Sequence, residues 1–252
     1  MVFGTVYFSV VSLLFGLVIG SFLNVVVYRL PRRESLVRPG SHCPRCGHAI
    51  RWYHNLPVAG WLILRGHCRD CGERISWRYP LVESLTGGLF VAAFFVFGLG
   101  GRLLLGWAFI AVMIIIVFID LDHQIIPDKI VLPAAAAGLA ASIALRPSGW
   151  WEYLVAAAGA AGFLFVIALI WAGGMGFGDV KMALLMGAVL GRSVIVALFL
   201  AFFLGGIVGV ALIATKVKSR KDRIPFGPFL AAGSIIALLC GQAILDLYLS
   251  LF

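Results

Sequence analysis

Two short stretches containing acidic residues interrupt a chain that is otherwise strongly apolar, and both hold aspartates that could do acid–base chemistry. One is GMGFGDVKM at 174–182, where Asp179 follows a cluster of glycines. The other is FIDLDHQIIPDKI at 118–130, where Asp120 ends an apolar run. Two carboxylates brought close together share one proton more readily than they both ionise. One can then activate water while the other polarises a peptide carbonyl, as in aspartic proteases.

Small and charged residues around these aspartates suit such a site. Gly176 and Gly178 allow close approach of the backbone, and a carboxylate near a helix start, such as Asp179, is favoured by the helix dipole. Lys181 is either a counter-charge for Asp179 or a side chain that reaches the membrane interface. Asp122 and Asp128 have the character of helix caps.

Two other interpretations of Asp120 and Asp179 stay open at this point. Both could be ordinary caps at the membrane interface, because helices often begin with aspartate. They could also line a proton or cation path in a transporter, where acidic residues inside a membrane are usually functional.

Four cysteines form a second constellation, in HCPRCGH and HCRDCGE. Each stretch holds a C-x2-C pair followed by glycine, and 21 residues separate the two pairs. This spacing is close to that of zinc ribbons, and four thiolates suit tetrahedral Zn²⁺. Four sulfurs leave no open position, so the site is predicted to be structural. The predicted ligands are Cys43, Cys46, Cys68 and Cys71, and three flanking histidines are not needed: His42, His48 and His67.

Long apolar segments must position both constellations. The chain has 252 residues, of which 62% are hydrophobic and 12% charged, against about 25% charged in soluble domains. Apolar stretches of about 20 residues predict transmembrane helices. We expect about eight, near 5–28, 80–98, 103–120, 130–146, 152–172, 180–191, 194–215 and 226–250.

The basic residues predict how these helices are oriented. The segment from Arg29 to Arg78 holds ten arginines and three acids, and KVKSRKDR at 216–223 is a second basic cluster. Both flank apolar spans, so they indicate cytoplasmic loops rather than a nucleic-acid partner. Counting crossings then puts the N-terminus in the periplasm and both aspartates at the cytoplasmic face. The reducing cytoplasm favours free thiols over disulfides.

Five blocks in order closely resemble the bacterial type IV prepilin peptidase family, over about residues 8–230. The blocks are GSFLNVVVYRLPR at 20–32, the paired C-x2-C stretches, RYPLVESLTG at 78–87, IDLDHQIIPD at 119–128 and GMGFGDVKM. The family comprises leader peptidases and N-methyltransferases of type IV pilus and type II secretion systems. It belongs to the GxGD aspartic proteases of the bacterial inner membrane, with a site that faces the cytoplasm.

The resemblance implies an all-α polytopic membrane protein with a small cytoplasmic zinc-binding loop. Its expected parts are a first helix at 1–28, a methyltransferase-associated zinc loop at 29–79 and a peptidase core at 80–252. The family's catalytic aspartates fall on Asp120 and Asp179, and Phe177 replaces the usual tyrosine between the motif glycines. The residues expected to support them are Gly176, Gly178, Lys181, Asp122 and Asp128.

The implied reaction is cleavage of a basic leader after glycine, followed by methylation of the new N-terminus with S-adenosylmethionine. Prepilins or pseudopilins would be the substrates and the lipid bilayer the surroundings. The intact cysteine loop favours the bifunctional enzyme over a peptidase alone. For the methyl donor, Asn24 and Glu83 are candidates that could instead bind neighbouring backbone or Arg78. The IPFGP stretch at 224–228 could shape a substrate groove or begin a helix at Pro225.

Two other classes of protein remain as competing hypotheses. One is an aspartate-lined transporter with a zinc-stabilised loop, although the acids cluster at one face of the membrane. The other is a non-enzymatic scaffold for a secretion machine.

Overall fold

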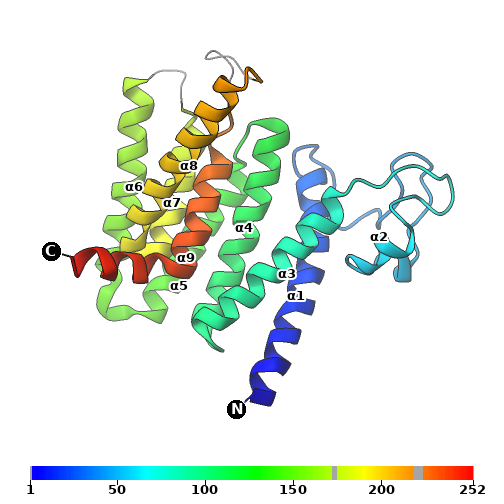
Figure 1. The fold of residues 1–252 in the computed structure, drawn as a ribbon, viewed down its shortest axis with the longest axis horizontal. Helices are drawn as coiled ribbons and strands as arrows, with labels where there is room; N and C mark the ends of the chain where they lie inside the picture. The colour runs from blue at the N-terminus through cyan, green and yellow to red at the C-terminus, as the bar shows by residue number, and fades with distance from the viewer. Residues whose placement is uncertain (1, 172–174, 218–223, 252) are drawn as a thin grey trace. The chain divides into compact units, whose positions relative to one another are not determined.

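The computed structural model describes residues 2–171, 175–217 and 224–251, and these are mostly helical (Figure 1). Two features of the sequence lie outside these ranges: Gly174, which begins the GMGFGDVKM stretch, and all of the 216–223 basic cluster except its first two residues. The chain divides into a first unit, Met1–Leu99, and a second unit, Gly100–Phe252, which are described separately.

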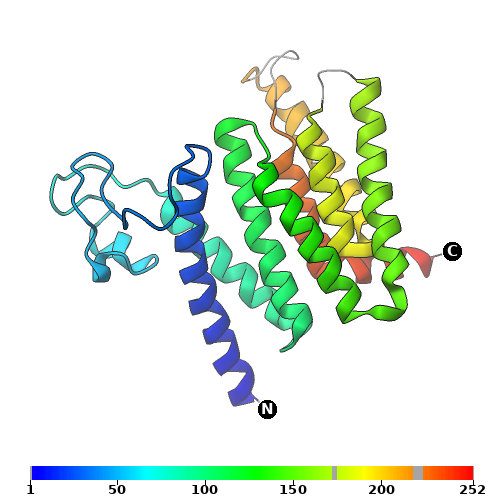
Figure 2. The same ribbon diagram turned by 180° about the vertical axis from the view of Figure 1, so that it is seen from behind.

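Two long helices make up most of the first unit. They are α1 (Val2–Arg29) and α3 (Arg78–Phe97), which pack against each other (Figures 1 and 2). Gly16 and Gly20 of α1 are spaced as in G-x3-G, and a Cβ on Gly16 would lie 2.7 Å from the Cα of Gly87 on α3. Small residues let helix backbones approach this closely in membranes. Its packing therefore groups α3 with α1. The expected boundary of the peptidase core, at residue 80, lies near the start of α3 instead.

The loop between α1 and α3 carries the cysteines. It contains two short helical turns, η1 (Trp52–His54) and α2 (Ala59–Ile63). The two cysteine pairs lie in separate turns, each closed by an isolated β-bridge, His42 to Ala49 and His67 to Arg74. The loop is thus built around its cysteines rather than around regular structure.

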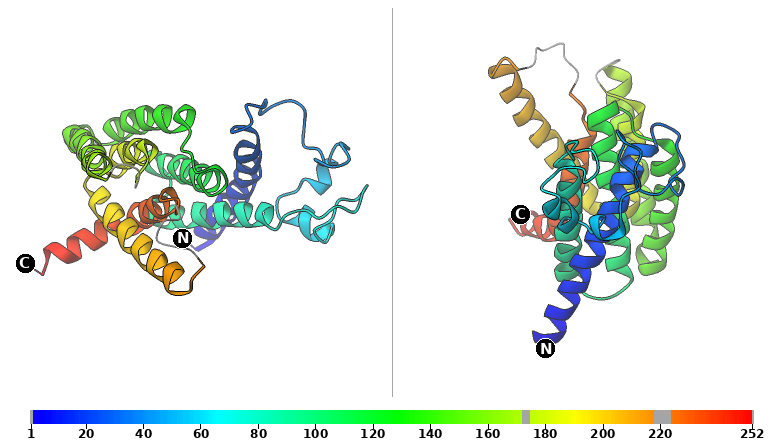
Figure 3. Two further views of the ribbon diagram at one scale, coloured as in Figure 1. Left: turned by 90° about the horizontal axis from the view of Figure 1, so that it is seen from above. Right: turned by 90° about the vertical axis from the view of Figure 1, so that its right-hand side faces the viewer.

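The second unit is a helical bundle, with α7 packed against α5, α6 and α9, and α9 packed also against α4 and α8 (Figures 2 and 3). Its helices are α4 (Gly101–His123), α5 (Asp128–Leu145), α6 (Trp150–Ile170), α7 (Phe177–Leu190), α8 (Val194–Ala214) and α9 (Gly227–Leu249), with turns η2 (Pro147–Gly149) and η3 (Gly191–Ser193). Large buried side chains from four of these helices form its core: Ile110, Met113, Ile116, Leu164, Met182, Leu185, Met186 and Leu230.

The predicted fold class is confirmed. Within the described residues, seven stretches are long and apolar enough to cross a membrane, and the stretch Phe177–Ala214 contains both α7 and α8. The chain is therefore a multi-pass membrane protein. The predicted sixth span is indeed short: α7 has 14 residues, about 21 Å, which is less than a bilayer's hydrocarbon thickness. One detail was wrong, because α9 begins at Gly227 rather than at Pro225.

Candidate active site and metal site

Asp120 lies in the last turn of α4 and caps the start of α9. Its Oδ2 accepts a hydrogen bond of 3.1 Å from the backbone N–H of Gly227, and the residue is only 6% exposed. A helix N-terminus favours a carboxylate because its first N–H groups have no partner within the helix. A Cβ on Gly227 would lie 2.6 Å from this Oδ2. Position 227 therefore needs glycine for the carboxylate to fit.

Asp179 is held in the same way by its own helix. Gly176 precedes α7, and its N–H donates to Asp179 Oδ2 at 3.2 Å, leaving the residue 7% exposed. A Cβ on Gly178 would lie 2.9 Å from the Cβ of Ile126, in the link between α4 and α5. Gly178 thus lets this link pack on the start of α7. A Cβ on Gly176 would make only ordinary contacts.

The structure brings these two aspartates together within the second unit. The helices that carry them, α4 and α7, both pack against α9, and the two carboxylates lie close enough to interact electrostatically. Each does cap a helix, as the simpler interpretation supposed, but each is also more than nine-tenths buried. Two buried carboxyl groups that interact electrostatically favour having one member protonated. Such a pair can supply a general base and a general acid at one place.

Lys181 and Asp128 pair with each other. The Lys181 Nζ lies 2.7 and 2.8 Å from the two carboxylate oxygens of Asp128, and the two side chains are 36% and 56% exposed. Lys181 is therefore engaged by Asp128 rather than by Asp179, and the pair links α7 to the start of α5. Asp122 is exposed at the end of α4.

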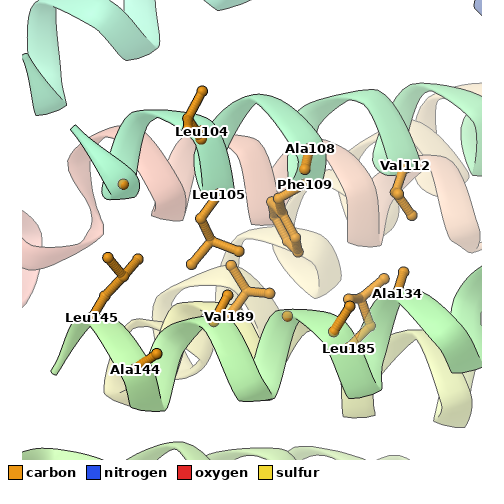
Figure 4. A pocket seen from close by; sticks show the side chains of 14 residues that line it. Leu104, Leu105, Ala108, Phe109, Val112, Ala134, Ala144, Leu145, Leu185 and Val189 are labelled. Atoms are coloured by element: carbon orange, nitrogen blue, oxygen red, sulfur yellow. The ribbon is translucent and has the colours of Figure 1, made fainter. Parts of the chain in front are cut away.

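An apolar pocket of about 530 Å³ lies elsewhere in the second unit, between α4, α5 and α7. Figure 4 shows Leu105 and Phe109 of α4 pointing toward α5, which carries Ala144 and Leu145 on the opposite side of the pocket. Val112 is eight residues, about 12 Å along the helix, from Asp120. All of its lining residues are apolar or glycine, so this pocket offers no group for acid–base chemistry.

The four cysteines form one cluster in the first unit. All four Sγ atoms lie within 4.8 Å of one another, and those of Cys43 and Cys71 are 3.8 Å apart. Sulfurs at the corners of a tetrahedron with metal–sulfur bonds of about 2.3 Å would be separated by about 3.8 Å. The predicted cysteines, Cys43, Cys46, Cys68 and Cys71, can therefore hold a metal ion.

The two cysteine turns repeat the same local structure. Gly47 donates its N–H to the Cys43 carbonyl and Gly72 to the Cys68 carbonyl, both at 2.9 Å, and both glycines have φ of +71°. That left-handed conformation suits glycine. An ion pair between Arg45 and Glu73 joins the two turns. The histidine before each turn makes the same contact with the carbonyl two residues earlier. His42 Nδ1 contacts the Gly40 carbonyl, and His67 Nδ1 contacts the Arg65 carbonyl.

The local backbone also favours a thiolate at Cys43. Backbone N–H groups of Cys46 and Arg45 hydrogen-bond its sulfur and lower its pKa to about 6. A thiolate is the form that binds metals. Within this turn, Cys43 is thus the cysteine whose thiolate the backbone favours.

Asn24 and Glu83 are both buried and bind backbone within the first unit. Asn24 Nδ2 donates to the Tyr79 carbonyl at 3.2 Å, and Glu83 Oε2 accepts from the Val58 N–H at 2.7 Å. They tie α1 to the start of α3, and α3 to the start of α2. These are the neighbouring-backbone contacts that the sequence offered as the alternative to methyl-donor binding.

Three residues important to these arrangements were not predicted from the sequence. Gly227 and Ile126 contact the aspartates or their glycines across long sequence separations. Arg29 is buried at the end of α1. The glycine in the IPFGP stretch was a signal for Gly227, but nothing in the sequence paired Gly227 with Asp120.

Comparisons with known proteins agree with this division of the chain. Residues 14–97 match a model described as the bacterial peptidase A24 N-terminal domain, and residues 107–210 match the type IV leader peptidase family. An Aeromonas salmonicida protein named prepilin leader peptidase/N-methyltransferase is 38% identical, covering 97% of this chain and 94% of its own length. The chain belongs to the type IV leader peptidase family. The resemblance found in the sequence is thus confirmed.

Other members of the family carry the same name. The Pseudomonas aeruginosa protein is 37% identical over 96% of this chain and 93% of its own length. The Bacillus subtilis protein is 34% identical over 94% of this chain and 96% of its own. No solved structure matches the chain.

Proposed function

We propose that this protein removes the basic leader from prepilins or pseudopilins at Asp120 and Asp179, and then methylates the new N-terminus with S-adenosylmethionine. The observation that carries the proposal is the buried carboxylate pair in the second unit, which includes the part matching the leader peptidase family. The relatives named above are peptidases and methyltransferases by name. Type IV pilus or type II secretion is the corresponding cellular process.

The geometry suggests how the pair would cleave a peptide. One ionised carboxylate takes a proton from water, and that water attacks the scissile carbonyl carbon. The protonated partner donates its proton to the carbonyl oxygen, and the intermediate collapses as the leaving amine is protonated. Each aspartate has Oδ2 fixed by a backbone N–H, at Gly227 or Gly176, which holds the carboxyl groups in place.

We place the protein in the bacterial inner membrane, with its N-terminus in the periplasm and the aspartates at the cytoplasmic face. The arginine-rich loop supports this orientation. A prepilin's own apolar helix would lie in the bilayer, so its scissile bond would reach the same depth. Asp179 lies at the start of α7. Because α7 is short, this start can lie near the depth of the scissile bond.

Zn²⁺ is the metal that best suits the cysteine cluster. Four thiolates at tetrahedral separations complete its coordination, so the ion would cross-link the loop without taking part in catalysis. S-adenosylmethionine, when bound, would supply the methyl group. We expect this activity to depend on the first unit, whose cysteine turns the metal would hold together.

Mass spectrometry of a purified prepilin incubated with the purified protein tests the proposal. Without S-adenosylmethionine, the product should lose the leader; with it, the product should also gain one methyl group. A prepilin whose glycine before the cleavage site is replaced by a bulky residue is the control and should stay intact. An unprocessed wild-type prepilin in both reactions would refute the proposal and favour a transporter or scaffold.

A further inference from the structure

A second cavity, of about 380 Å³, lies wholly within the first unit. One wall is a face of α1 that includes Val18, Phe22, Val25 and Arg29, and the other is the loop at 36–41 and 55–57. Neither the aspartates nor the cysteines line it. Its volume lies in the range of sites for small molecules.

Arg29 is the one charged residue that lines this cavity. It is 7% exposed, and its guanidinium donates to the carbonyls of Ser35, at 2.9 Å, and Gly40, at 3.2 Å. Both acceptors are neutral. Among the ion pairs of residues 2–171, 175–217 and 224–251, none includes Arg29. A buried cation without a counter-charge is costly, and guanidinium donors remain for another acceptor. The cavity therefore suits a ligand with negative charge.

The apolar residues of the cavity wall indicate what kind of ligand would fit. Val18, Phe22 and Val25 line the cavity along one face of α1, and Val18 and Phe22 are half exposed. From Val18 to Arg29 the helix rises about 16 Å, and this whole length belongs to a predicted span. The cavity thus runs from hydrocarbon depth to the membrane interface, with its cation at the interface end. An amphiphile with an anionic head and an apolar tail matches this arrangement.

We propose that this cavity binds one anionic phospholipid, with its phosphate on Arg29 and an acyl chain along Val18, Phe22 and Val25. Ser41 and Asn55 line the cavity on the loop side and offer polar groups to the headgroup. S-adenosylmethionine fits less well, because its ammonium and sulfonium groups would find no acid in the lining. A lipid there would bridge α1 to the loop that carries the cysteines. Lipid binding in this cavity would depend on neither peptidase nor methyltransferase activity.

Native mass spectrometry of the full-length protein, with lipids added to the detergent solution, tests the proposal. One phosphatidylglycerol should bind at least roughly tenfold more tightly than phosphatidylcholine, because the choline cation of the zwitterionic lipid offsets the charge of its phosphate and would find no acid in the lining. Arg29→Gln should remove that preference. Val18→Trp should weaken phosphatidylglycerol binding by filling the apolar end of the cavity.

Val6→Trp is the matched control. Val6 and Val18 are both on α1 and both 58% exposed, and Val6 does not line the cavity. If Arg29→Gln fails to fold, the comparison of the two tryptophan variants decides. Equal binding of the two lipids, or equal binding by both tryptophan variants, would overturn the proposal. Displacement of phosphatidylglycerol by inorganic phosphate or by S-adenosylmethionine would also overturn it, in favour of a free-anion or methyl-donor site.

Discussion

The cysteines of the first unit are held by two short hydrogen-bonded turns, whereas the aspartates of the second unit are held by the ends of long helices. Each cysteine turn closes within a few residues, from Cys43 to His48 and from Cys68 to Glu73. Asp120, by contrast, depends on Gly227, which is far away in the sequence. The cysteine cluster is thus a local structure, and the aspartate pair is a consequence of the packing of α4, α7 and α9.

Because of this difference, we expect different changes to disrupt the cysteine cluster and the aspartate pair. Three of the four cysteines are not buried, so the loop around them has little core and needs a cross-link. The aspartates sit beside a core of large buried side chains that needs no ion. Loss of metal should therefore affect the first unit, and changes in helix packing should affect the second.

The largest expected effect is on cleavage in Asp120→Asn or Asp179→Asn. Asparagine keeps the shape but cannot exchange the proton, so the initial rate of prepilin cleavage should fall by about 10²–10⁴-fold or more. Asp246→Asn is the control, because Asp246 is exposed and lies 3.8 Å from Arg192. Its rate should stay within about twofold of the wild type. Near-normal cleavage by either active-site variant would exclude that aspartate from catalysis.

Cys43→Ser or Cys68→Ser should separate the two units functionally. Removing one of four thiolates should reduce bound zinc from one equivalent to a small fraction, because all four ligands complete the tetrahedron. We expect methylation to be lost and cleavage to persist. Metal analysis and mass spectrometry of the product measure both, with Cys240→Ser as control. Full metal content in the serine variants, or equal loss of both activities, would contradict this division.

Alanine substitutions at glycines near the aspartates should lower the cleavage rate most where a Cβ has least space. A Cβ at Gly227 or Gly178 would meet Asp120 or Ile126 at under 3.0 Å, so alanine at either position should lower the cleavage rate by about tenfold or more through displaced packing. Gly209→Ala on α8 is the control, since nothing lies within 4 Å of its Cβ position. Normal rates for both crowded variants would show that the carboxylates tolerate movement.

Lys181→Met should have the smallest effect. Its pair with Asp128 is well exposed, and exposed pairs contribute about 0–1 kcal/mol to stability. Cleavage should remain within about threefold of the wild type, and thermal unfolding should shift by only a few degrees. A loss as large as that of the aspartate variants would mean that Lys181 acts on the catalytic pair itself.

The sequence predicted the helices well, because each span is one continuous apolar segment whose length can be counted in the sequence. The eight expected spans correspond to α1, α3, α4, α5, α6, α7, α8 and α9, most within a few residues. Counting crossings puts Asp120 and Asp179 at one face of the membrane, and this stays a prediction. The cysteine cluster followed from spacing alone.

Contacts that depend on how helices pack could not be predicted. Lys181 was predicted to be either a counter-charge for Asp179 or a side chain that reaches the membrane interface, yet it pairs with Asp128 of α5. The role of Gly227 depends on α9 approaching α4, and the burial of Arg29 depends on the path of the loop. Such partners are fixed in three dimensions by side-chain packing, which a single sequence does not record.

The most direct test of the central claim compares the residual cleavage rates of Asp120→Asn, Asp179→Asn and the double variant. If the two carboxyl groups work as one unit, the three rates should be equally low, because losing either member removes the whole function. If the double variant's loss is instead the product of the two single losses, or if one single variant keeps most of its activity, the aspartates act independently and the account is contradicted.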